Sequence, residues 1–175
     1  MRIISGTARG CALISPKNNA RPTLDAVKES LFNIIAPNLR GATFLDLFAG
    51  SGAIGLEALS RGVSSAVFVD IDTATVTKNV EKTRLENATI LKMNYSPALR
   101  YLSAQNQQFD FIFADPPYGF DFTPNLVTEV IPLLSTNGTF MLERGRDEPS
   151  FELPQKLVLR RTKIYSNCVI DFFGS

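Results

Sequence analysis

Short apolar runs alternate with helical patterns between residues 41 and 143. Most of the runs are continuous in apolar residues, as expected for parallel strands covered on both faces. They occupy residues 43–47, 66–70, 89–93, 109–114 and 139–143, and the helical patterns occupy 53–61, 73–85, 97–103 and 124–134. This alternation predicts right-handed strand–helix–strand units and an α/β fold with a doubly wound, mainly parallel sheet.

The two ends of the chain depart from this alternation. Segments 157–165 and 168–173 flank Ser166-Asn167, which predicts an antiparallel hairpin that completes the sheet. Segments 2–5 and 11–15 predict a short hairpin, followed by a helix capped by Thr23 with Leu24, Val27, Leu31 and Ile34 on one face. We expect a single domain over residues 1–175, in which residues 1–40 form an extension on a core of residues 41–175.

Several classes of site are excluded by the side chains that the sequence lacks. The chain has no histidine and only two cysteines, Cys11 and Cys168, so it offers neither a zinc-ligand pattern nor a histidine-based triad, and we expect no metal. Its apolar stretches are shorter than a membrane helix requires, and its first residues lack the apolar core of a signal peptide. These features predict a cytoplasmic protein with reduced thiols.

A glycine-rich turn follows the first predicted strand of the core. Gly50, Gly52 and Gly55 match the pattern G-x-G-x-x-G, and Asp70 ends the next strand 20 residues after Gly50. This combination is typical of dinucleotide sites, where the acidic residue binds a ribose. By itself the motif therefore supports a nicotinamide-dependent oxidoreductase as well as other nucleotide-binding enzymes.

Asp46 favours a different ligand, because it lies inside the strand four residues before Gly50. A carboxylate at this position would repel a pyrophosphate and attract a ligand with a positively charged amino-acid end. S-adenosylmethionine has an α-ammonium and a sulfonium and carries no phosphate. We expect Asp46 to accept from the ammonium and Asp70 to accept from the two ribose hydroxyls.

Residues Asp115-Pro116-Pro117-Tyr118 follow the apolar run 109–114. If the Asp115 carboxylate and the Pro116 carbonyl accept from the exocyclic amine of a base, the amine nitrogen can pyramidalise and attack a methyl group. The two prolines restrict the loop, and Tyr118 can stack on a flipped-out base, an interaction worth about 1–3 kcal/mol. The segment therefore predicts methyl transfer to an amine of a nucleobase.

These motifs together resemble those of the bacterial 16S rRNA guanine-N2 methyltransferases. The resemblance rests on segments 45–52, 55–62 and 115–118, on Arg21-Pro22-Thr23 with the residues around it, and on Lys163-Ile164-Tyr165. It spans nearly the whole chain. It implies a Rossmann-like methyltransferase that uses S-adenosylmethionine to methylate N2 of one guanine in 16S rRNA, within an assembled or assembling small ribosomal subunit.

The resemblance also assigns roles to individual positions. It implies a cofactor site made of Asp46, Phe48, Ala49, Gly50, Ser51, Gly52, Asp70, Ile71, Asn94 and Tyr95. Asn94 stands where many members of the family have aspartate, and its amide oxygen can still accept from the adenine amine. The rRNA candidates are Arg2, Arg9, Arg21, Thr23, Lys28, Lys163 and Tyr165.

The distribution of charge agrees with a nucleic-acid substrate. Residues 1–40 carry six basic and two acidic side chains, residues 41–143 carry six and eleven, and residues 144–175 carry six and four. Basic ends around an acidic middle are typical of a nucleic-acid enzyme with a separate cofactor core.

Three other functions remain open from the sequence. An N6-adenine or N4-cytosine methyltransferase could use the same Asp-Pro-Pro-Tyr segment, although 175 residues leave little room for a target-recognition region. The glycine motif allows an NAD-dependent oxidoreductase, and a non-catalytic rRNA-binding assembly factor could retain the same fold. We expect a monomer, as is usual for one compact domain.

Overall fold

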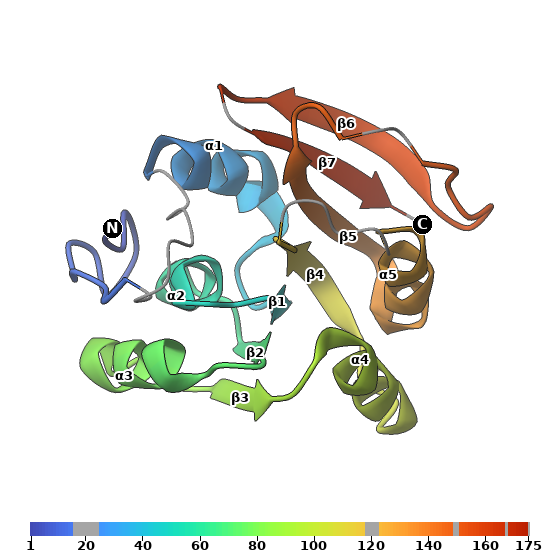
Figure 1. The fold of residues 1–175 in the computed structure, drawn as a ribbon. Helices are drawn as coiled ribbons and strands as arrows, with labels where there is room; N and C mark the ends of the chain where they lie inside the picture. The colour runs from blue at the N-terminus through green and yellow to red at the C-terminus, as the bar shows by residue number, and fades with distance from the viewer. Residues whose placement is uncertain (16–24, 118–122, 149–150, 167, 175) are drawn as a thin grey trace.

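The computed structural model describes residues 1–15, 25–117, 123–148, 151–166 and 168–174 (Figure 1). The described strands form one seven-stranded sheet in the order β3-β2-β1-β4-β5-β7-β6. Strands β1 to β5 pair in parallel, and β7 pairs antiparallel with both β5 and β6. Their bounds are β1 Thr43–Leu47, β2 Ser65–Asp70, β3 Ala88–Lys92, β4 Phe109–Ala114, β5 Leu134–Gly145, β6 Val158–Ile164 and β7 Cys168–Gly174. The predicted fold class, a mainly parallel sheet ending in an antiparallel hairpin, is confirmed.

Helices cover both faces of the sheet (Figure 1). Residues of α1 Asp25–Ile35, α2 Ala53–Ser60 and α3 Ala74–Thr83 join one buried cluster, and residues of α4 Tyr95–Ala104 and α5 Thr123–Val130 join the other. Two 3-10 turns, η1 Ala36–Asn38 and η2 Ile131–Leu133, follow α1 and α5. Pro132 lies in η2, so the α-helix ends before this proline, as the lost backbone N–H requires.

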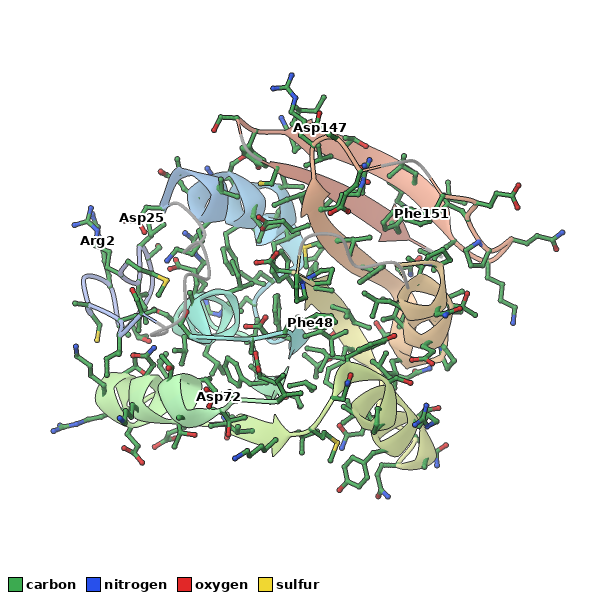
Figure 2. All side chains as sticks on the ribbon, viewed as in Figure 1. Arg2, Asp25, Phe48, Asp72, Asp147 and Phe151 are labelled. Atoms are coloured by element: carbon green, nitrogen blue, oxygen red, sulfur yellow. The ribbon has the colours of Figure 1, made fainter. Side chains whose placement is uncertain are left out.

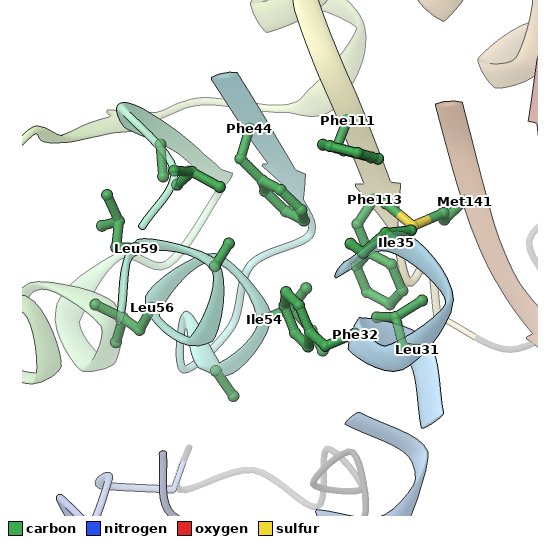
Figure 3. Close-up of a cluster of buried hydrophobic side chains, with 14 of the residues drawn as sticks. Leu31, Phe32, Ile35, Phe44, Ile54, Leu56, Leu59, Phe111, Phe113 and Met141 are labelled. Atoms are coloured by element: carbon green, nitrogen blue, oxygen red, sulfur yellow. The ribbon is translucent and has the colours of Figure 1, made fainter. Parts of the chain in front are cut away.

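The first cluster is centred on phenylalanines between α1, α2 and the sheet (Figure 3). Phe32 of α1 stacks on Phe44 of β1 with ring centroids 6.5 Å apart, and Phe44 stacks on Phe111 of β4 at 6.4 Å. Phe32 and Phe44 are fully buried. Burying such rings stabilises the fold by about 1.5–3 kcal/mol each, so this stack fixes α1 on the two strands that bear the candidate site.

The N-terminal segment is attached to α2 by polar contacts, and its Ile3 and Leu13 join the buried cluster. The carboxylate of Glu57 accepts from the backbone N–H groups of Ile4 (2.7 Å) and Ser5 (3.0 Å). The hydroxyl of Ser60 donates to the Ser5 carbonyl at 2.6 Å, and a Cβ added at Gly6 would lie 1.7 Å from the Ser60 carbonyl oxygen. Only glycine therefore allows the chain to cross α2 at this point.

The predicted N-terminal hairpin is present but short: Arg2 and Ala12 form an antiparallel bridge, Ile3 accepts from Gly10 and donates to Cys11, and Leu13 donates to Met1. Two other local expectations differ from the structure. Strand β5 begins at Leu134 rather than at residue 139: Leu134 pairs with Phe109, and the register then shifts across the polar residues 135–138 to Thr139. Helix α4 begins at Tyr95 rather than at Pro97, with Asn94 as its N-cap.

Candidate active site

The candidate site lies where the order of the strands reverses. From β1 the chain passes outward to β2 and β3 and then returns to β4 on the other side of β1. Leu47 and Ala114, the last residues of β1 and β4, are in register. The loop after β1 and Asp115 after β4 therefore leave the sheet side by side, at the position where open α/β sheets bind ligands.

Asp70 anchors the glycine loop. One of its carboxylate oxygens, Oδ2, accepts from the N–H of Gly50 at 2.7 Å, and the other, Oδ1, accepts from the N–H of Asp72 at 2.9 Å. Each carboxylate oxygen has a second lone pair, so Asp70 can still accept from a ligand. A Cβ on Gly50 would meet no atom closer than the Phe48 carbonyl oxygen at 3.9 Å, so the loop backbone at Gly50 is open to approach.

Asp46 is buried behind this loop. Its side chain is only 2% exposed, and Oδ2 accepts from the N–H of Gly55 in the first turn of α2 at 2.9 Å. Loss of hydration raises the pKa of Asp46 to about 8, the Gly55 hydrogen bond opposes the rise, and the charge of Asp70 adds to it. A carboxylate whose negative charge is this costly favours a cationic ligand beside it.

Asp115 forms the other side of the site and is partly exposed. Loss of hydration and the nearby charges of Glu143 and Asp46 raise its pKa well above the ordinary value. Pro116 is buried and Pro117 is exposed, whereas Tyr118 lies outside the described residues. The carboxyl edge of the sheet thus brings together Asp46, Asp115 and Glu143 from three neighbouring strands.

The remaining cofactor candidates border the same edge. Phe48 (labelled in Figure 2) has a positive φ of 59°. Its ring centroid lies 5.4 Å from that of Tyr95 at the start of α4. Asn94 and Ile71 are exposed at the ends of β3 and β2, and Ile71 is 69% exposed. An exposed apolar side chain and two aromatic rings around the ends of β1 to β3 can enclose a flat heterocycle. Ala49, Ser51 and Gly52 complete the loop, and Gly52 is the N-cap of α2 in the left-handed conformation.

The residues predicted to bind rRNA differ in their exposure and in their contacts. Arg2, Arg9 and Lys163 are exposed, and Arg2 lies 3.6 Å from Asp25 (Nε to Oδ2; Figure 2). The hydroxyl of Tyr165 donates to Ser30 at 2.8 Å, which joins the β6–β7 turn to α1. Arg21 and Thr23 lie outside the described residues.

Lys28 was predicted to contact phosphate, and this prediction is wrong. Its side chain is 0% exposed, and Nζ donates to the Arg2 carbonyl and lies 3.7 Å from the equally buried Glu57. Burial lowers the pKa of Lys28, and the charges of Glu57 and Asp25 oppose this effect. Lys28 is therefore part of the internal attachment of the N-terminal segment.

Two polar residues of the site region belong to no sequence motif and were not predicted. Glu143 of β5 is buried beside Asp115, and its Oε2 has no hydrogen-bond partner among the described residues. Asn79 of α3 donates to the carbonyls of Ser51 (2.9 Å) and Ile14 (3.0 Å) and accepts from the Ile14 N–H. It therefore joins the glycine loop to the N-terminal segment.

Two findings concern other kinds of site and cover only the described part of the chain. No group of three or more acidic, cysteine or histidine side chains there could hold a metal ion. None of the helices there has the length and apolar character needed to span a bilayer.

A doubly wound sheet with an inserted antiparallel last strand, a glycine loop after β1 and Asp-Pro-Pro after β4 define an α/β methyltransferase. The family model described as conserved hypothetical protein 95 matches residues 1–174. The chain belongs to this family, the RsmD-type methyltransferases.

Individual relatives agree with this assignment. The chain is 40% identical over 142 residues to the Escherichia coli K12 protein named ribosomal RNA small subunit methyltransferase D, covering 79% of this chain and 68% of that protein. It is 37% identical over 172 residues to the YlbH protein of Bacillus subtilis strain 168, covering 94% of each. The solved structure of yhhF from Escherichia coli matches with a TM-score of 0.87 at 30% identity, covering 99% of this chain and 97% of that one.

Proposed function

We propose that this enzyme transfers a methyl group from S-adenosylmethionine to the N2 amine of a guanine in the 16S rRNA of the small ribosomal subunit. The observation that carries the proposal is Asp115, a carboxylate at the end of β4 followed by two prolines, beside the glycine loop after β1. The name of the Escherichia coli relative supports small-subunit rRNA as the substrate. A protein that acts on this RNA is expected in the cytoplasm.

The charge of the site supports a cationic cofactor. Asp46, Asp115 and Glu143 all have raised pKa values, each mainly because burial removes hydration from the charged form. A pyrophosphate would add negative charge to this region, whereas an ammonium and a sulfonium would compensate it. This argument favours S-adenosylmethionine over a nicotinamide dinucleotide.

Each part of the cofactor has residues suited to hold it. We assign Asp46 to the ammonium and Asp70, through its remaining lone pairs, to the ribose hydroxyls. We assign Phe48, Ile71, Asn94 and Tyr95 to the adenine, and Ala49 to Gly52 to the close approach of the backbone. The bound cofactor supplies an electrophilic methyl group on a positively charged sulfur.

The residues of the enzyme orient the amine. Asp115 and the Pro116 carbonyl accept from its two N–H groups, so that its lone pair is freed from the ring and directed at the methyl. Alignment of this kind contributes up to about 7–11 kcal/mol to lowering a barrier. The prolines preset the two acceptors, and Tyr118 stacks on the extruded base.

The RNA itself is held elsewhere. We propose that Arg2, Arg9 and Lys163, with Arg21 and Thr23, bind phosphates and thereby position the target without reading its sequence. Residues 1–40 serve as the RNA-binding extension of the single domain, and the enzyme acts as a monomer.

A labelling experiment tests the function. The enzyme is incubated with methyl-labelled S-adenosylmethionine and either small ribosomal subunits, free 16S rRNA or DNA, and labelled nucleosides are then identified. We expect N2-methylguanosine from the rRNA, and its loss in Asp115→Ala with cofactor binding retained. Label in N6-methyladenine or N4-methylcytosine of DNA alone would establish the rival amino-methyltransferase. Calorimetry should show binding of S-adenosylhomocysteine, and binding of NADH in its place would support the oxidoreductase.

A further inference from the structure

Asp115 and Glu143 occupy matching positions on neighbouring strands. Ala114 of β4 is in register with Leu142 of β5. Asp115 directly follows Ala114, and Glu143 directly follows Leu142. Phe113 and Met141, two residues before each carboxylate, both belong to the cluster under α1 and α2. Since side chains alternate across a strand, Asp115 and Glu143 share this face, on strands about 4.8 Å apart.

The burial of Glu143 destabilises the fold, and the proposed function does not explain why a carboxylate is buried there. It is 8% exposed, and its Oε2 is buried without a hydrogen-bond partner among the described residues. An unpartnered buried carboxylate oxygen costs about 1–3 kcal/mol or more. A single proton held between Glu143 and Asp115 would remove much of this cost, because the two groups could share one hydrogen.

Two titratable groups on two further strands act on the pair. Asp46 of β1 acts on Asp115, and Cys168 at the start of β7 lies against Glu143. Burial and the charge of Glu143 raise the pKa of the Cys168 thiol to about 12, so it stays neutral near pH 7. Within the described residues, the charges that act on Asp115 are thus those of carboxylates. Nearby like charges in a dry site cannot all ionise, so the group retains protons near neutral pH.

We infer that Asp115 and Glu143 act as one proton-sharing pair that receives the proton released by the amine, with Glu143 as the positioning residue. This inference rests on the proposed function and deepens it by assigning the destination of the proton. The amine lone pair forms the new N–C bond, and the electron pair of the breaking C–S bond remains on sulfur. The N–H proton passes to Asp115, within the pair.

The charges balance in this scheme without help from solvent. Before transfer, a positive sulfonium faces the Asp115–Glu143 pair, which holds one proton and one negative charge. After transfer, sulfur is neutral and the pair holds a second proton. Loss of the cation and gain of the proton therefore cancel within the buried site. The pair returns its extra proton to water when S-adenosylmethionine replaces the demethylated product.

Proton release on ligand binding tests the inference without relying on turnover. S-adenosylmethionine and S-adenosylhomocysteine are titrated into the enzyme by calorimetry at pH 7, in buffers with different ionisation enthalpies. We expect binding of S-adenosylmethionine to release more protons than binding of S-adenosylhomocysteine, by up to about one. Equal proton release for the two ligands would overturn the inference while leaving the proposed function intact. Failure of both ligands to bind would instead contradict the proposed function.

Two variants test whether the difference in proton release arises from the Asp115–Glu143 pair. Glu143→Gln should reduce the difference in proton release between the two ligands by at least half and remove one ionisation from the pH profile of kcat. Asp171→Asn is the matched control, because Asp171 is a buried carboxylate on the neighbouring strand β7, where it pairs with Arg144 on the opposite face of the sheet. It should lower stability and leave proton release unchanged. If Asp171→Asn reduced the difference as much as Glu143→Gln, the assignment to Glu143 would be wrong. The comparison of the two ligands on the unmodified enzyme decides the inference even if a variant does not fold.

Discussion

Lys28 of α1 and Glu57 of α2 form an ion pair with an Nζ–Oε2 distance of 3.7 Å, and neither side chain is exposed to solvent. The pair is not symmetric in its surroundings. Glu57 also accepts from Arg61 at 2.7 Å and from two backbone N–H groups of the N-terminal segment. Lys28 additionally donates to the Arg2 carbonyl.

This asymmetry predicts unequal losses of stability. Glu57→Ala should lower the free energy of unfolding by about 3–5 kcal/mol, because it leaves a buried cation and two backbone donors without their acceptor. Lys28→Met should cost less, about 1–3 kcal/mol, since Glu57 keeps its other donors. Urea unfolding of both variants and of the double variant measures the two losses and their coupling. A larger loss for Lys28→Met than for Glu57→Ala would contradict the prediction.

The buried Asp46 predicts a dependence of stability on pH. Its pKa is raised in the folded protein to about 8 from an ordinary value of 3.8, so the folded state binds more protons than the unfolded state between these values. The stability that this group contributes is fully present below its unfolded pKa and is lost as pH rises through about 8, at up to about 1.4 kcal/mol per pH unit.

Asp46→Asn should remove this contribution. We expect the ligand-free variant to lose less stability than the parent between pH 5 and pH 8 in urea unfolding, and to bind S-adenosylmethionine more weakly. Asp115 and Glu143 have pKa shifts in the same direction, so the parent slope includes their share. Parallel pH curves for parent and variant would show that Asp46 is not the group responsible.

Substitutions at two glycines near the cofactor loop should both lower stability but differ in their effect on ligand binding. A Cβ at Gly55 would lie 2.3 Å from Phe68 Cε1 and 3.1 Å from Asp46 Oδ2, so Gly55→Ala should lower stability by about 1–3 kcal/mol through overpacking. Gly50→Ala meets open space, and its φ of +53° costs about 1–2 kcal/mol. Its methyl group should instead obstruct the ligand. Thermal unfolding and calorimetry with S-adenosylhomocysteine would separate these effects, and full affinity in Gly50→Ala would refute the proposed approach of the backbone.

Asn79 predicts a link between the N-terminal segment and the glycine loop. Asn79→Ala removes one acceptor and one donor group that serve Ile14 and Ser51, so it should lower stability by about 2–3 kcal/mol. Hydrogen exchange should accelerate at the amide of Ile14, and affinity for the cofactor should fall. Lys78→Ala, an exposed change on the same helix, should have neither effect. Unchanged exchange at Ile14 in Asn79→Ala would contradict this link.

The core strands could be predicted well because their apolar runs end sharply. Strands β1 and β4 have the predicted bounds, 43–47 and 109–114. Strand β5 was predicted too short, since the polar residues 135–138 lie at a register shift between the pairings of Leu134 and Thr139 and show no pattern of apolar side chains. The short N-terminal hairpin could be predicted from local spacing, whereas the attachment of its first segment to α2, which lies far along the chain, has no local signal.

The site was partly predictable for a related reason. Asp46, Gly50, Asp70 and Asp115 each belong to a local motif at the end of a strand, and parallel strands bring such ends to one edge. Glu143 belongs to no motif, and its nearness to Asp115 follows only from the pairing of β4 with β5. The burial of Lys28 could have been predicted, because it lies one helical turn before Phe32, on the buried face of α1.

The pairing of β1 with β4 also has a consequence for the kinetics of folding. These strands are neighbours in the sheet, yet two strands and three helices separate them in the sequence. Contacts between distant segments form late and slow folding, because a long loop must first be closed. A partly folded chain that lacks this contact has no methyl-donor site to offer. Ligand binding thus selects molecules in which β1 and β4 have met and can serve as a kinetic readout for that step of folding.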